Sequence, residues 1–334
     1  MARGRCLRRR GRGRAGEPPG RRWPACRRAG RPPVKVACVG ECMIELLDLG
    51  DGTMRQSFGG DVFNTAAYLS RQATGQANVE FITLTGDDFY SAQMRALWRR
   101  YGVGDAYAPV LPGGRPGLYL IRRDAAGERT FYHYRSESAA RQLFGPSQPS
   151  WIDEALTGHD LVYSSAITLS ILAPAARARF ADVLRQAGKR GAVVAFDGNF
   201  RASGWPSGSA AQEAITRILP LVDIALPTLA DEQQVFGDPD ADACARRLQN
   251  AGVAEIAVKL GAAGCLVVDP GGRASTLVPA VPGVAVLDTT AAGDAFNGAY
   301  LAARLAGAPP LAAAKAGNAL AAEVITHPGA LLPP

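Results

Sequence analysis

The chain has 334 residues, of which 47% are hydrophobic and 20% charged, an ordinary balance for a globular enzyme with a buried core. No apolar run approaches the roughly 20 residues needed to cross a bilayer, so we expect no membrane segment. The net charge of +7 is unevenly placed: residues 1–33 hold twelve arginines and one acid, whereas the rest carries 25 basic and 29 acidic residues. The main part of the chain is therefore mildly acidic.

The N-terminal tail, residues 1–33, consists mostly of Arg, Gly and Pro and has almost nothing to bury, so we expect it to be disordered. It could bind nucleic acid or an acidic partner through its charge, or serve as a transit segment. It could also be an upstream extension from a wrongly chosen start codon. We favour the last alternative, because the first predicted strand begins directly at Val34, and we do not expect nucleic-acid binding.

Cysteine usage indicates a cytoplasmic protein. Two of the six cysteines lie in the tail, and the others are scattered through apolar segments without a Cys-x-x-Cys pair. The three histidines are far apart in sequence. This pattern predicts neither a disulfide framework nor a zinc site.

The first half of the chain predicts a strand, a hairpin and a helix. Residues 34–40 form an apolar run, and the segments on either side of Asp51-Gly52, a favoured turn pair, predict a hairpin. The pair Gly59-Gly60 then opens a helix. Paired glycines let a backbone lie against a ligand, with Asp61 and Asn64 within reach of hydroxyl groups. The alternative is an ordinary strand-to-helix turn with Asp61 as its N-cap.

A second predicted hairpin pairs residues 117–122 with 129–135 around a turn at 125–128. Polar and aromatic residues share both strands, so pattern alone favours an amphipathic surface hairpin. Because side chains alternate along a strand, His133 and Arg135 are expected on one face. A guanidinium there is a fixed positive fork suited to a carboxylate.

The rest of the chain alternates strands with helices, which is typical of a doubly wound, mainly parallel sheet with ligands at the carboxyl ends of its strands. Residues 161–165, 192–196, 224–227 and 255–260 predict strands, and residues 91–101, 173–188 and 313–325 predict helices. The polar loop from Asp197 to Arg201 follows a buried strand and could line a ligand site, or be an ordinary loop. No Walker A sequence is present, so a P-loop kinase is not indicated.

Residues 287–298 give the strongest indication of a functional site. A strand-like run at 284–287 leads into small residues and then a helix, which has free N–H groups and a positive dipole end that favour anions. Asp294 in the first turn could take a proton from a hydroxyl nucleophile beside a bound phosphate. Acidic residues in first turns also occur for capping alone.

The run Asp-Thr-Thr-Ala-Ala-Gly-Asp at 288–294 resembles the C-terminal signature of the ribokinase-like (PfkB) carbohydrate kinases, usually Asp-Thr-x-Gly-Ala-Gly-Asp. Ala291 replaces the first glycine of that signature. The Gly-Gly-x-x-x-Asn arrangement at 59–64 resembles the sugar-contacting motif of the family, and residues 40–43 and 64–66 resemble its 2-keto-3-deoxygluconate kinase branch. The resemblance covers residues 34–330 and implies a ribokinase-like α/β fold with helices on both faces of the sheet. It also implies a small β-sheet lid from about 44–58 and 115–136.

The resemblance implies transfer of a phosphoryl group from ATP, with Mg²⁺, to 2-keto-3-deoxygluconate, giving 2-keto-3-deoxy-6-phosphogluconate. Asp294 would be the catalytic base, and the backbone of Ala292, Gly293 and Asp294 would form the anion hole. The implied substrate contacts are Gly59, Gly60, Asp61, Asn64, Tyr119, His133, Arg135, Arg201 and Asp294. The implied ATP contacts are Asn199, Arg201, Lys259, Gly261, Gly264, Ala291, Ala292, Gly293 and Asn318.

The family often has Asn-x-x-Glu where this chain has Thr228 followed by two acids, so either Asp231 or Glu232 would organise the metal through water. Relatives of this kind often pair through their lids, which implies a homo-oligomer. Two alternatives stay open: another sugar kinase of the family, such as a fructokinase, and a non-catalytic sugar-sensing relative.

Overall fold

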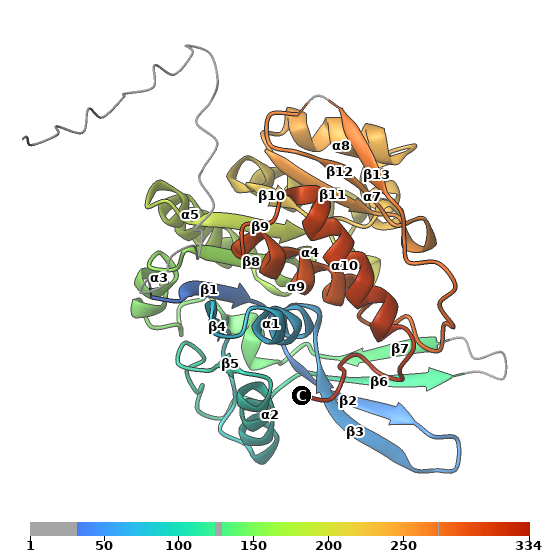
Figure 1. Cartoon of the computed structure of the whole chain (residues 1–334). Coiled ribbons are helices and arrows are strands. Elements are labelled where there is room, and N and C mark those ends of the chain that lie inside the picture. Colours follow the sequence, from blue (N-terminus) through green and yellow to red (C-terminus); the bar gives the residue numbers. More distant parts are fainter. Residues whose placement is uncertain (1–31, 124–128, 273) are drawn as a thin grey trace, which may run out of the picture.

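The computed structural model describes residues 32–123, 129–272 and 274–334. The predicted tail, apart from its last two residues, and the turn of the second hairpin lie outside the described residues. Figure 1 shows a large sheet with helices on both faces and a smaller sheet that extends away from it. None of the helices in the described ranges is long and apolar enough to cross a bilayer.

The large sheet has nine strands in the order β13-β12-β11-β10-β9-β8-β1-β4-β5. The strands from β5 to β11 run parallel, and β12 and β13 are antiparallel additions at one edge. Every residue of β8 and β9 is buried, which explains why these strands read as continuous apolar runs. The strands are β1 (Val34–Val39), β4 (Ala77–Ile82), β5 (Val103–Gly104), β8 (Leu161–Ser165), β9 (Val193–Asp197), β10 (Ile224–Ala225), β11 (Glu255–Lys259), β12 (Cys265–Val268) and β13 (Ser275–Val278).

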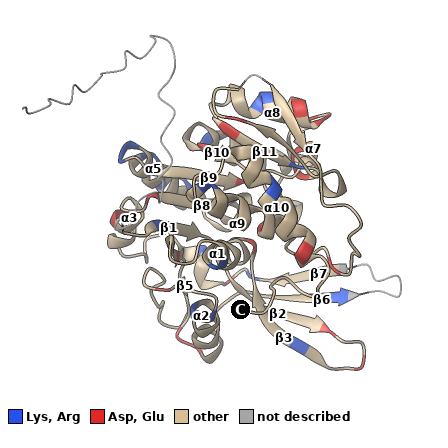
Figure 2. Cartoon of the chain, viewed as in Figure 1, with Lys and Arg blue, Asp and Glu red and all other residues tan. Residues whose placement is uncertain are grey.

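Two hydrophobic cores lie on the two faces of this sheet. One face is covered by α1 (Asp61–Gln72), α2 (Phe89–Arg100), α9 (Ala292–Leu305) and α10 (Pro310–Val324). The other face is covered by α3 (Trp151–Leu156), α4 (Ala166–Ile171), α5 (Pro174–Lys189), α6 (Gly208–Ile218), α7 (Leu229–Phe236) and α8 (Ala241–Asn250). Figure 2 shows basic and acidic residues interspersed over these helices. The architecture confirms the predicted doubly wound fold.

The small sheet has the order β3-β2-β6-β7 and contains β2 (Met43–Asp48), β3 (Met54–Gly59), β6 (Leu118–Arg123) and β7 (Arg129–Tyr134). β2 pairs antiparallel with β3, and β6 pairs antiparallel with β7, so both predicted hairpins are confirmed. A parallel pairing of β2 with β6 joins the hairpins into one sheet. We refer to these four strands as the lid.

One local prediction was wrong. Residues 284–287 form no strand: Val286 and Leu287 are 62% and 63% exposed, and the Leu287 N–H donates to Ile325 O across a loop. The apolar character of the run suggested burial in the sheet, but β13 already ends the sheet at that edge. The helix that follows starts at Ala292, close to its predicted position.

Candidate active site

Asp294 lies in the first turn of α9, with 9% of its surface exposed. Its Oδ2 accepts a hydrogen bond of 2.9 Å from Asn64 Nδ2 on α1. Asn64 Oδ1 is buried and, among the described residues, has no hydrogen-bond partner. A buried acceptor without a partner costs free energy, so this oxygen is suited to accept a hydrogen bond from a ligand hydroxyl group.

The environment of Asp294 raises the pKa of its carboxyl group to about 7. Burial contributes most, followed by the negative charge of Asp61, and Asp197 acts in the same direction. The hydrogen bond from Asn64 and the positive charge of Lys259 oppose this rise. A carboxylate with a pKa near neutrality is matched to the work of a general base.

The α9 N-terminus presents free backbone donors beside this carboxylate. Within the described residues, the N–H groups of Gly293 and Asp294 have no acceptor, whereas the Ala292 N–H contacts Thr289 O at 3.3 Å. Of the three predicted anion-hole donors, two are therefore free and one is weakly engaged. Free donors at a helix start, with the positive end of the dipole, suit a phosphoryl group.

Asp61, whose charge acts on Asp294, forms a hydrogen bond with Asn199. Asp61 Oδ2 accepts hydrogen bonds from Ser165 Oγ at 2.5 Å and from Asn199 Nδ2 at 2.9 Å. Burial raises the pKa of Asp61. The structure thus brings the ends of β8, β9 and α1 together around the predicted residues. The N-cap of α1 is Gly60, so Asp61 is the first helical residue and not the cap.

Contacts within the protein explain why positions 59 and 60 are both glycine. A Cβ atom on Gly59 would lie 2.6 Å from the Tyr119 hydroxyl oxygen, and one on Gly60 would lie 2.2 Å from Glu41 O. The Tyr119 hydroxyl donates to the Glu45 carboxylate, which also accepts from Ser57 at 2.6 Å. Gly59 therefore leaves room on β3 for the Tyr119 side chain of β6, and Gly60 lets the start of α1 approach the backbone of Glu41.

Arg135 follows β7 and forms an ion pair with Glu41, which is 2% exposed and also accepts from Ser138. Arg135 Nε is buried and, in the part of the chain that the structure describes, has no partner. The His133 ring stacks on Tyr119 with 5.8 Å between ring centroids. Burial lowers the pKa of His133, and the positive charges of Arg135 and Arg201 lower it further. The predicted lid residues and Arg201 are thus within electrostatic reach of one another.

The two acids at the start of α7 have different surroundings. Arg201 Nη1 donates to Asp231 at 3.2 Å, and its own side chain is 57% exposed. Glu232 is 1% exposed and pairs with Arg247 at 2.5 Å. Burial raises the pKa of Glu232 to about 7. Asp231 is therefore the acid on the side of Arg201, and Glu232 faces the interior.

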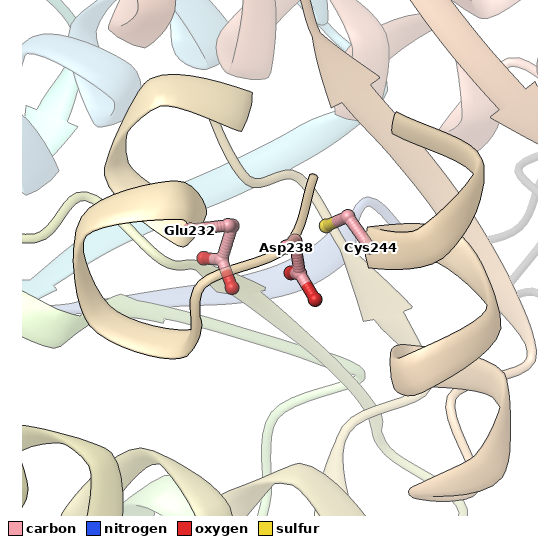
Figure 3. Close-up of side chains that lie close together, drawn as sticks. All are labelled: Glu232, Asp238 and Cys244. Atoms are coloured by element: carbon pink, nitrogen blue, oxygen red, sulfur yellow. The ribbon is translucent and has the colours of Figure 1, made fainter. Parts of the chain in front are cut away.

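Glu232, Asp238 and Cys244 converge as a metal-ligating group would (Figure 3). The guanidinium of Arg247 already fills the space between them, because Arg247 Nη2 lies 2.7 Å from Asp238 and 3.9 Å from Cys244 Sγ. This cation neutralises the acids, so the donor set does not fit a metal ion.

Four of the residues predicted near ATP, Lys259, Gly261, Gly264 and Asn318, lie on β11, in the turn after it and on α10. Gly261 and Gly264 both have positive φ, and a Cβ on Gly264 would lie 2.1 Å from Val278 O. The Asn318 amide donates to the carbonyl oxygens of Val278 and Pro279, so it ties α10 to the segment after β13. Lys259, at the end of β11, is 7% exposed and bonded to protein groups.

Comparison with known proteins agrees with this geometry. The family model described as pfkB family carbohydrate kinase matches residues 34–334. The chain belongs to the pfkB family of carbohydrate kinases. It is 42% identical over 301 residues to a 2-dehydro-3-deoxygluconokinase of Dickeya dadantii, covering 89% of this chain and 96% of that protein. It is 40% identical to a protein of the same name from Escherichia coli K12, covering 90% and 97% of the two chains.

Solved structures of similar fold include a 2-dehydro-3-deoxygluconokinase of Thermotoga maritima, with a TM-score of 0.75, 21% identity and coverage of 90% of this chain and 96% of that one. A fructokinase of Xylella fastidiosa with bound ATP has a TM-score of 0.75, 23% identity and coverage of 89% and 93%. These matches support the fold of a pfkB kinase.

Ala291, the departure from the family signature, is strained in this pfkB chain. Its φ of 59° and ψ of 13° are left-handed, a region that glycine occupies freely and other residues enter at a cost of about 1–2 kcal/mol. The left-handed backbone conformation therefore explains why the signature usually has glycine at this position. The chain tolerates alanine at the N-cap of α9, directly before the free donors.

Several site residues were missed by sequence reasoning. Glu41 and Glu45 hold Arg135 and Tyr119, and Asn297 and Tyr163 lie behind Asp294. Asn297 carried a usable signal, since it is a polar residue three positions after Asp294 in an otherwise apolar helix. Two acids in the apolar segment 41–46 were a comparable signal.

Proposed function

We propose that this chain is an ATP-dependent kinase that phosphorylates 2-keto-3-deoxygluconate to 2-keto-3-deoxy-6-phosphogluconate. The observation that carries the reaction type is the start of α9, where a buried carboxylate with a pKa near 7 adjoins two free N–H groups. The substrate assignment rests on the names of the relatives at 40–42% identity and on Arg135, whose Nε is available to a carboxylate.

In this proposal the lid and α1 bind the sugar acid. Arg135, oriented by Glu41, pairs with the substrate carboxylate, and Asn64 Oδ1 accepts from a hydroxyl group. Tyr119 and His133 offer a stacked aromatic surface beside that carboxylate. Gly59 and Gly60 shape the turn that positions Asn64. These contacts bring the terminal hydroxyl of the open chain to Asp294.

The chemical step uses α9. Asp294 takes the proton of the attacking hydroxyl, and the N–H groups of Gly293 and Asp294 stabilise the charge that develops on the transferred phosphoryl group. Asn199, Arg201, Gly261, Gly264 and Asn318 are proposed to line the nucleotide side. Mg²⁺ would neutralise phosphate charge there, and Asp231 is the acid that would hold it through water, because its side chain is 13% exposed whereas that of Glu232 is 2% exposed.

We also propose a cytoplasmic, homo-oligomeric protein. Cys38, Cys42, Cys244 and Cys265 are free buried thiols, as expected in a reducing compartment. The lid exposes aromatic side chains at 44–65% of their surface, at Phe131, Tyr132 and Tyr134, which a second copy could cover. Light scattering of the purified chain tests the second point, and a monomer at micromolar concentration contradicts it.

Product analysis tests the proposed reaction. Purified protein is incubated with MgATP and 2-keto-3-deoxygluconate, its galactose-derived epimer or fructose, and the phosphate ester is identified by mass spectrometry and ³¹P NMR. We expect one ADP per 6-phosphorylated sugar acid. Phosphorylation of fructose in preference to the acid would favour a fructokinase, and no phosphorylation of any sugar would favour a sensing role.

A further inference from the structure

A closed hydrogen-bond network lies behind the start of α9. Lys259 Nζ donates to Asp197 Oδ2 at 2.7 Å and to Asn297 Oδ1 at 3.1 Å. Asn297 Nδ2 in turn donates to Asp197 Oδ2 at 2.6 Å and contacts the Tyr163 hydroxyl at 3.1 Å. Lys259 and Asp197 are 7% and 2% exposed. The ends of β9 and β11 are thereby joined to α9 by buried, charge-assisted bonds.

This network lies directly under the proposed reaction centre. Asn297 is one helical turn after Asp294 on α9, and a Cβ atom on Gly293 would lie 3.5 Å from Lys259 Nζ. The ammonium group therefore lies close to the backbone that carries the free N–H groups. It approaches that backbone from the protein interior, where Coulomb interactions are weakly screened.

The charges around Asp294 are unbalanced. The titratable side chains that influence or face its carboxylate, from α1, the lid, β8, β9 and β11, are Asp61, Tyr68, Tyr119, Tyr163, Asp197 and Lys259. Asp61 and Asp197 raise the pKa of Asp294, and Lys259 lowers it. A cation in this position offsets the repulsion among three carboxyl groups.

We propose that Lys259 is a positioning residue for phosphoryl transfer: its bonds to Asp197 and Asn297 fix the anion-hole end of α9 and hold a positive charge behind Asp294. This inference rests on the proposed function of Asp294 as the base. It differs from a direct contact between Lys259 and ATP, because Lys259 would act through its bonds to the buried side chains of Asp197 and Asn297.

The test compares the pH dependence of kcat/KM for the sugar acid, at saturating MgATP, in Lys259→Met, Asp197→Asn and the double variant. Loss of Lys259 removes a charge that lowers the pKa of Asp294. The acidic limb of the pH profile, where kcat/KM falls as Asp294 is protonated, should therefore move to higher pH by about one unit. Loss of Asp197 should move the limb to lower pH, and the double variant should lie between the two. Ionisation of ATP is common to all variants and cancels in these differences.

Two control variants distinguish a specific effect on the pKa of Asp294 from a general loss of active protein. Lys259→Arg retains the cation and should restore the limb to its wild-type position, whereas Lys315→Met removes an exposed lysine of α10 and should shift nothing. An acidic limb at the same pH in Lys259→Met and the wild type would overturn the inference. A raised KM for ATP without a shift in the limb would instead indicate a direct nucleotide contact and would also overturn it.

Failure of the inference is distinguishable from failure of the proposed function. If Asp294→Asn abolishes turnover and Lys259→Met leaves the limb in place, Asp294 remains the base and the role of Lys259 is wrong. If Asp294→Asn retains turnover, the proposed base itself is wrong, and with it the inference.

Discussion

The end of the lid and the carboxyl ends of the strands in the large sheet each hold a cation paired with a buried carboxylate, but the two pairs differ in which donors they leave free. In the sheet, Lys259 is bonded to Asp197 and Asn297 and is 7% exposed. In the lid, Arg135 is paired with Glu41, its side chain is 18% exposed, and its Nε has no partner among the described residues.

The difference separates two tasks. A cation enclosed by protein groups can set the charge and position of its neighbours, whereas a planar guanidinium with one donor free can also recognise a ligand. We therefore assign the chemistry to the carboxyl ends of the strands in the large sheet and the choice of substrate to the lid. The variants below test that division, from the largest expected effect to the smallest.

Asp294→Asn should have the largest effect. Asparagine keeps the size of the side chain and can still accept from Asn64, but it cannot take a proton, so turnover should fall by roughly 10²–10⁴-fold. Steady-state kinetics measure the loss, and calorimetry should show that sugar and ATP still bind, because the anion-hole donors belong to the backbone. Near-normal turnover would exclude Asp294 as the base.

Arg135→Leu should change selectivity and leave the chemistry intact. Loss of a desolvated charge pair typically costs about 2–5 kcal/mol, so binding of the sugar acid should weaken by that order while ATP affinity changes little. The measurement is the ratio of kcat/KM for 2-keto-3-deoxygluconate to that for fructose, which cancels general losses of folded protein.

Glu41 complicates this variant, because a buried carboxylate loses its cation. The double variant Arg135→Leu with Glu41→Gln removes both charges and should lose the same selectivity with less loss of stability. An equal loss for acid and neutral sugar would mean that Arg135 only shapes the lid.

The division between lid and sheet was partly predictable from sequence. The parallel sheet, both hairpins and the start of α9 followed from apolar runs, turn pairs and small residues before a helix. The partners of the charged residues did not follow. Glu41 and Arg135 are 94 positions apart, and Asp197 and Lys259 are 62 apart, and such pairings depend on strand order, which periodicity does not encode.

Ala291→Gly should slightly stabilise the folded protein. Glycine relieves the left-handed φ at the N-cap of α9, and the greater freedom of the unfolded chain offsets part of that gain, leaving at most about 1 kcal/mol of stabilisation. Chemical denaturation measures it. The same substitution at Ala303, inside α9, should destabilise the protein by about 1 kcal/mol, and equal signs at the two sites would contradict the strain at Ala291.

Deletion of residues 1–33 should have the smallest effect. A tail of Arg, Gly and Pro has little to pack, so a chain that begins at Val34 should keep its melting temperature and kcat/KM. A filter-binding assay with and without the tail tests the electrostatic alternative. Failure of the shortened chain to fold would place the domain boundary upstream of Val34.

The most direct test of the central claim is a competition in one vessel. The protein is given equal concentrations of 2-keto-3-deoxygluconate and fructose with MgATP limiting, and the two phosphate esters are quantified by ³¹P NMR. We predict that the phosphorylated sugar acid dominates for the wild type and loses that dominance in Arg135→Leu. A wild type that forms mainly fructose phosphate would contradict the account of the substrate.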